Sequence, residues 1–223
     1  MGRALGQNIL GKDNSDRQGY TEGQNYFFGR SGWNPDTIIC DTFTRPYDEV
    51  LAYMSSENAT RSAHFIIGKD GRREFVVDYK NTAFIGTTST DGESPNYYGK
   101  STLPQVQERE TNAGFFSYSI AFETSGGETS GLLTPLQYKA GWECIMWILT
   151  DMKERYNVTF QPDREHLVGH YQTNPESHPD SPDTAPHMAF PYDRYLGEIR
   201  YWMSGRDFTK PHEIIEIRKG ATR

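Results

Sequence analysis

The segment from residue 117 to residue 156 joins an alternating strand to a strongly capped helix. Residues 117–123 read SYSIAFE, in which small or polar residues alternate with large apolar ones, as in a strand with one face on a core. Downstream, Thr134-Pro135-Leu136-Gln137 predicts a helix start, with a threonine N-cap, proline at the first position and glutamine closing a capping box. The helix should run to about Tyr156. Strands that alternate with helices in this way are typical of α/β domains.

Further elements of both kinds follow from the apolar pattern. Strands are predicted at 37–40, 64–67, 74–77 and 166–170, and helices at 46–55 and 192–203. Asp70-Gly71 lies between two of these strands and favours a tight hairpin turn, which requires positive φ angles. Residues 86–114 are polar and rich in turn residues, so we expect a long loop there.

These elements predict one α/β domain, with a mixed central β-sheet flanked by helices. Residues 1–30 are rich in Gly, Asn, Gln and Asp and show no periodicity, so they are expected to form an N-terminal arm. The domain itself should span residues 31–203, followed by a C-terminal extension at 204–223. A chain of 223 residues is long enough to bury a core without disulfides, and its two cysteines match no metal or redox spacing.

Composition and charge exclude several classes of protein. The chain carries 23 basic and 30 acidic residues, a formal net charge of −7, and nucleic-acid binders depend on basic side chains that neutralise phosphates. We therefore expect no nucleic-acid binding. No apolar run approaches the length of about 18 residues that a membrane span needs, so none is expected. The start MGRALGQNIL lacks the apolar stretch of a secretory signal peptide.

Residues of types that bind metal ions cluster between positions 170 and 183. His170 ends an apolar run, and His178 and Asp180 follow in a proline-rich loop, so that nitrogen and carboxylate groups can meet at one point. Catalytic zinc takes three such ligands and lowers the pKa of water in its fourth position. Loops of Pro, Asp and His are also common without metal, so the spacing by itself leaves a structural loop open.

Two residues on predicted strands are further candidates. Glu123 ends the alternating strand, on the same face as Ser117, Ser119 and Ala121, where small neighbours leave room for a ligand. The alternative for Glu123 is a solvated strand-end acid. For His64, the alternative to a functional role is a hydrogen-bonded histidine in the core.

Six segments of the chain form a recognisable series. They are Pro35–Ile39, Ser62–Ile67 with Asp70-Gly71, Ser119–Glu123, Leu133–Gln137, Gly169–Gln172 with Asn174-Pro175, and Phe190–Tyr192. In this order they resemble the zinc-dependent N-acetylmuramoyl-L-alanine amidases, the superfamily that includes peptidoglycan recognition proteins and many phage and clostridial lysins. The resemblance runs from about Trp33 to Leu196.

The resemblance implies a peptidoglycan hydrolase, which cleaves the amide between N-acetylmuramic acid and the L-alanine of the stem peptide. It implies zinc held by Asp41, His170 and Asp180, with Glu123 as the general base for water. His178 would stabilise the oxyanion. Such a protein would be made in the cytoplasm without a signal peptide and act at the cell wall, as a phage lysin, an injected effector or a virion component.

The chain departs from the family pattern at several of these positions. Asp41 stands where the family has a histidine, and the third ligand, usually Cys or Asp, falls on Ser181 or Asp180, with Asp183 as the nearest substitute. Carboxylates are harder ligands than imidazole, so zinc should bind less tightly and Mn²⁺ should compete better.

The same resemblance places His64 and Phe84 at substrate-binding positions, although Phe84 replaces a tryptophan of the family pattern. The altered residues leave a second function open: a metal-free, catalytically inactive module that binds peptidoglycan fragments or a partner protein.

Overall fold

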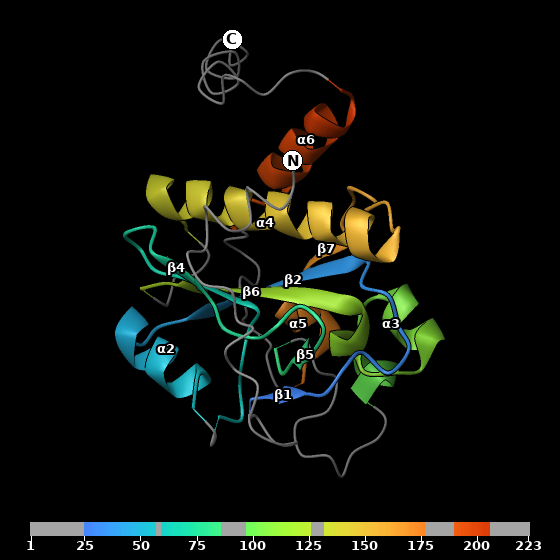
Figure 1. Ribbon diagram of the computed structural model, residues 1–223, viewed down its shortest axis with the longest axis horizontal. Helices are drawn as coiled ribbons and strands as arrows, with labels where there is room; N and C mark the ends of the chain where they lie inside the picture. Colours follow the sequence, from blue (N-terminus) through green and yellow to red (C-terminus); the bar gives the residue numbers. More distant parts are fainter. Residues whose placement is uncertain (1–24, 57–58, 86–96, 126–131, 177–189, 206–223) are drawn as a thin grey trace.

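A five-stranded mixed sheet forms the centre of the computed structural model, which describes residues 25–56, 59–85, 97–125, 132–176 and 190–205 (Figure 1). Its strand order is β4-β3-β6-β2-β7, with bounds β2 Thr37–Phe43, β3 Phe65–Ile67, β4 Arg73–Phe75, β6 Ser117–Glu123 and β7 Leu167–Gly169. Strands β3, β6, β2 and β7 run parallel, and β4 is antiparallel to β3 at one edge. The predicted α/β fold with a mixed sheet is confirmed.

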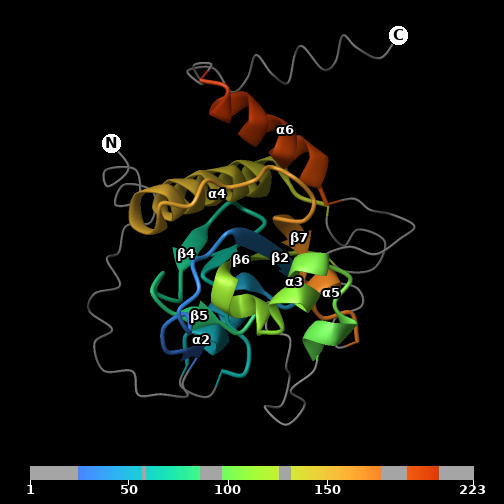
Figure 2. The same ribbon diagram turned by 90° about the vertical axis from the view of Figure 1, so that its right-hand side faces the viewer.

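Helices cover both faces of this sheet. The long helix α4 (Pro135–Tyr156) lies across one face and packs against α6 (Tyr192–Met203), where the Tyr138 and Tyr195 rings stack 4.5 Å apart. Helix α2 (Tyr47–Met54) lies on the opposite side of the sheet from α4 in both Figures 1 and 2. None of the described helices combines the length and the apolar character that a membrane span requires.

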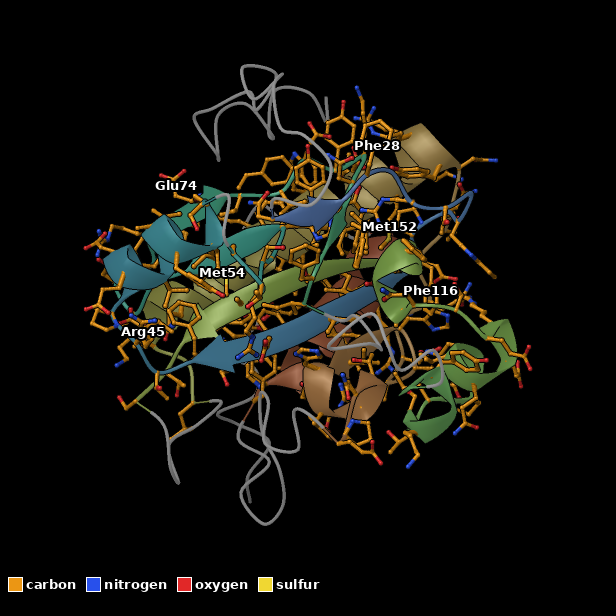
Figure 3. The ribbon with its side chains drawn as sticks, turned by 90° about the horizontal axis from the view of Figure 1, so that it is seen from below. Phe28, Arg45, Met54, Glu74, Phe116 and Met152 are labelled. Atoms are coloured by element: carbon orange, nitrogen blue, oxygen red, sulfur yellow. The ribbon has the colours of Figure 1, made fainter. Side chains whose placement is uncertain are left out.

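Alternation along the strands produces two apolar layers. Ile38, Phe65, Ile120 and Phe122 are buried toward α4, together with Ile145 of that helix. The intervening residues of the same strands, such as Ile39, Ile66 and Ala121, are buried in the second layer, beneath α2. Figure 3 looks onto this second face, where Met54 and Phe116 lie over the sheet.

The start of α4 has the predicted cap and a further role. Thr134 Oγ1 accepts the Gln137 backbone N–H at 3.1 Å, and Gln137 Oε1 accepts the Thr134 N–H at 3.1 Å. The Gln137 amide also donates to the Glu123 carbonyl oxygen at 2.7 Å. The cap therefore fixes the helix start to the end of strand β6.

The hairpin turn differs from the predicted two-residue turn. Gly68 N–H donates to Arg72 O at 2.8 Å, so the turn contains three residues, Lys69, Asp70 and Gly71. Gly71 has φ +82°, whereas Asp70 does not adopt a positive φ. A turn followed by a left-handed glycine is the usual three-residue hairpin connection, and this arrangement needs one positive φ angle instead of two.

The predicted long loop at 86–114 contains short helices in its described part. They are η2 Tyr97–Lys100, α3 Pro104–Arg109 and η3 Ala113–Phe116. Segments of four to six residues are too short to show a helical period in the sequence. Burial of Val106 and Phe116 in the second layer holds these short helices in place.

The described part of the predicted N-terminal arm packs on the domain. Strand β1 (Tyr26–Phe27) pairs with β5 (Thr82–Ala83) in a second, two-stranded sheet. Arg30 is 6% exposed, and its guanidinium donates to the carbonyl oxygens of Tyr79 at 2.9 Å and Ser117 at 2.8 Å. The packed domain therefore includes residues 25–30, which the sequence had assigned to the arm.

Candidate functional site

The candidate residues lie where the parallel strands end. Cys40 of β2 is level with Gly169, the last residue of β7, so Asp41, near the carboxyl end of β2, and His170, just beyond β7, lie at the same height. Helix α5 (His170–Thr173) begins directly after β7. Ligands of α/β proteins commonly bind at this carboxyl edge of the sheet.

Asp41 and His170 meet in the interior of the protein. His170 Nδ1 lies 3.1 Å from Asp41 Oδ2, and the two side chains are each 2% exposed. Asp41 Oδ1 accepts the backbone N–H of Thr42 at 2.8 Å, which fixes the orientation of the carboxylate. A carboxylate can accept but not donate when ionised, so the hydrogen bond requires the proton on Nδ1 of His170.

Arg61 is a third member of this cluster, which sequence reasoning missed. Its Nη2 atom lies 3.2 Å from the same oxygen, Asp41 Oδ2, and its side chain is 45% exposed. The negative charge of Asp41 is thus balanced by a guanidinium. One sequence feature could have drawn attention to Arg61: it lies immediately before the Ser62–Ile67 segment of the family pattern.

Glu123 lies on the same face of the sheet as Asp41. Ala121 of β6 is the partner of Asp41 in the register, and Glu123 is two residues further along β6, which places it roughly 7 Å beyond that level. Its Oε2 atom accepts the Lys69 N–H at 2.9 Å, and the side chain is half-buried. The carboxylate therefore holds the hairpin turn, and its second oxygen makes no hydrogen bond to the described residues.

The Asp41–His170 pair has donors and spacing that suit zinc. Two ligand atoms of a tetrahedral zinc ion, with bonds of about 2.0 to 2.1 Å, lie roughly 3.3 Å apart. The corresponding distance between Oδ2 and Nδ1 is 3.1 Å. The described residues contain no group of three or more metal-ligating side chains. The predicted third ligand Asp180, its alternatives Ser181 and Asp183, and His178 all lie outside the described residues.

His64 lies in the core instead of on a substrate-accessible surface. It is 1% exposed; its Nδ1 accepts the Ser119 N–H at 3.1 Å and its Nε2 lies 3.2 Å from the Asn81 carbonyl oxygen. This environment matches the alternative of a hydrogen-bonded core histidine, because so little of the ring is open to a substrate. Burial and the adjacent Arg30 guanidinium hold the pKa of His64 well below its usual value.

We expect this buried histidine to make the protein less stable in acid. Below pH 6.5 the unfolded chain protonates His64, whereas the folded chain keeps it neutral, so the free energy of unfolding falls as the pH falls. The slope contributed by one such group is at most about 1.4 kcal/mol per pH unit. Urea unfolding of wild type and His64→Gln from pH 7 to pH 5 measures it. Parallel pH dependences in the two proteins would contradict the assignment.

Phe84 belongs to an aromatic cluster with residues of the N-terminal segment. Its ring meets Phe27 edge-on at 5.0 Å between centroids, and Phe27 is 43% exposed. The Phe84 N–H donates to Ser62 Oγ at 2.9 Å, which places Phe84 beside the segment that carries Arg61. The Phe84 side chain is half-buried.

His166 and the two cysteines take structural roles. His166 Nδ1 lies 2.7 Å from Asp163 Oδ1, within the turn that precedes β7. The sequence predicted a strand over 166–170, but β7 covers Leu167–Gly169 and His170 begins helix α5. Cys40 and Cys144 are both fully buried, and burial raises the pKa of the Cys144 thiol to about 12. Both side chains are buried among apolar residues of the layer beneath α4.

Comparison with known proteins finds solved structures of low similarity. No protein-family model matches the chain, and no curated protein sequence does. One similar structure is the endolysin amidase LysCS from Clostridium intestinale URNW, with 16% identity, a TM-score of 0.46, and 81% of this chain and 91% of that chain covered.

Two further structures contain muropeptide ligands. AmiD from E. coli, bound to anhydro-N-acetylmuramic acid-L-Ala-D-gamma-Glu-L-Lys, has 16% identity and a TM-score of 0.47, with 78% of this chain and 65% of that chain covered. AmpDh3 from Pseudomonas aeruginosa, bound to an anhydromuramic pentapeptide, has 14% identity and a TM-score of 0.48, with 90% and 76% covered. At this level of similarity, the function of this chain has to be argued from its own residues. Two of these three neighbours, LysCS and AmiD, are themselves N-acetylmuramoyl-L-alanine amidases.

Proposed function

We propose that this protein is a metal-dependent amidase that acts on peptidoglycan at the bacterial cell wall. The observation that carries the proposal is the buried Asp41–His170 pair, whose ligand atoms lie 3.1 Å apart at the carboxyl edge of the sheet. Glu123 supports it, since its carboxylate lies on the same face of the sheet with one oxygen that no described residue engages. The six motifs that resemble the amidase family favour the bond between N-acetylmuramic acid and L-alanine as the substrate.

The ligand set proposed for zinc is Asp41, His170 and Asp180. When bound, zinc makes water more acidic and polarises a carbonyl group. The chain's own residues complete the reaction. Glu123 accepts the proton of the attacking water and returns it to the amine of L-alanine as the amide bond breaks. His178 donates a hydrogen bond to the oxygen that becomes negative in the tetrahedral intermediate.

Metal content tests this proposal most directly. We expect wild-type protein to contain zinc or manganese near one equivalent per chain and to release stem peptides from purified peptidoglycan. His170→Ala should lose both the metal and the activity, because it removes the nitrogen ligand. His166→Ala is the matched control, since His166 is paired with Asp163 and takes no part in the site. Elemental analysis and a peptide-release assay on the three proteins give the answer.

A different result would favour another function. Wild-type protein that stays metal-free after incubation with excess zinc would contradict the amidase. The ion pair between Arg61 and Asp41, at 3.2 Å, favours the second candidate, a metal-free module that binds peptidoglycan fragments. That module would sediment with insoluble peptidoglycan in the presence of a chelator and release no peptide from it.

A further inference from the structure

We propose that Arg61 is an internal counter-ion that competes with the metal for Asp41 and thereby sets the metal affinity of the site. The inference rests on the proposed metal-dependent function and adds a residue to it. Arg61 Nη2 and His170 Nδ1 approach the same oxygen, Asp41 Oδ2, at 3.2 Å and 3.1 Å. A metal bound through that oxygen would share it with a positively charged guanidinium.

The surroundings of Asp41 make this competition strong. Asp41 is 1% exposed, so its charge is poorly hydrated and depends on neighbouring positive or donor groups. Arg61 supplies a full positive charge, whereas His170 and the Thr42 N–H supply hydrogen bonds. A divalent cation can bind Asp41 only if the ion pair between Arg61 and Asp41 breaks. If the guanidinium stays nearby, its positive charge repels the cation.

Arg61 is placed to move away from Asp41, in contrast to the buried Arg30. Arg30 is 6% exposed and donates to the carbonyl oxygens of Tyr79 and Ser117, so its position is fixed. The Arg61 side chain is 45% exposed, and its charge can be rehydrated by a change of rotamer. Arg61 is therefore an exchangeable partner of Asp41, present in the metal-free site and displaced when the metal binds.

Removal of this charge should increase metal affinity. We expect Arg61→Gln to lower the dissociation constant for Zn²⁺ at least about tenfold relative to wild type, measured by isothermal titration of the metal-free protein with zinc chloride. The difference should shrink at high salt, because a half-exposed charge is screened. Arg61→Lys keeps the charge and should stay close to wild type.

Arg45→Gln is the matched control, since Arg45 forms an ion pair of the same length, 3.2 Å, with the exposed Glu49. It lowers the net charge equally and should leave the zinc affinity unchanged. If Arg61→Gln fails to fold, as judged by thermal unfolding, Arg61→Met replaces it, because Met keeps the apolar stem without the charge.

The outcomes separate this inference from the proposed function. Equal zinc affinities in wild type and Arg61→Gln, or an equal gain in Arg61→Lys, would overturn the role of Arg61 even if wild type binds zinc and releases peptides. Absence of zinc binding in every variant would overturn both. Tighter binding in Arg61→Gln alone would support the inference, whatever the rate of peptide release.

Discussion

Ile145→Asp is expected to abolish cooperative folding. Ile145 is fully buried on α4, in the apolar layer between that helix and the sheet. The substitution removes its apolar contacts and places a carboxylate where nothing can pair with it. The cost is on the order of 5 kcal/mol, comparable to the whole stability of many domains. Thermal and urea unfolding, followed by circular dichroism, would measure the loss.

The same substitution at an exposed position of α4 provides the control. Lys139 is exposed in the second turn of the helix, so Lys139→Asp should change the free energy of unfolding little. A soluble Ile145→Asp protein that unfolds cooperatively near the wild-type midpoint would show that this face of α4 does not hold the core.

Glu123→Gln should lower kcat/KM for stem-peptide release by about 10²- to 10⁴-fold, the usual contribution of a general base. Glutamine can still accept the Lys69 N–H, which Glu123 Oε2 accepts at 2.9 Å, so the hairpin turn should keep its place. Alanine at this position would also remove that hydrogen bond and lower the free energy of unfolding by about 1.5 to 3 kcal/mol. A loss of activity could then reflect lost stability instead of lost catalysis. Peptide release and thermal unfolding are measured on the same preparations.

Glu74 offers a matched carboxylate outside the site. It is half-buried like Glu123, and Figure 3 shows it on the edge strand β4 of the sheet. Glu74→Gln should keep the wild-type rate. A Glu123→Gln protein with the wild-type rate would remove Glu123 from the mechanism, while metal binding at Asp41 and His170 could still be tested by itself.

Structural features that depend on residues close together in the sequence were predicted correctly. The cap at Thr134 and Gln137 and the alternation of SYSIAFE involve residues at most a few positions apart, so the sequence determines them almost alone. The hairpin was also predicted, but its turn was not: Gly71, not Asp70, has the positive φ. Register at the turn depends on strand pairing, which local propensity does not fix.

Contacts between distant segments were decided by the tertiary structure. Asp41 and His170 are 129 residues apart in sequence, and they meet because β2 and β7 are parallel neighbours in register. The resemblance to a family placed these two residues in one ligand set, but nothing in the sequence paired Asp41 with Arg61, which reaches it from a segment 20 residues further along the chain.

The interior position of His64 has the same cause. The sequence left a core histidine and a substrate contact open, and burial beneath Arg30 favours the first. Sequence by itself determined the α/β class, the long capped helix and the residue types available at the carboxyl edge of the sheet. Only the tertiary structure decided which of those residues contact one another. Ion pairing and burial depend on distances in space, and these follow from the order of the strands and the length of the side chains.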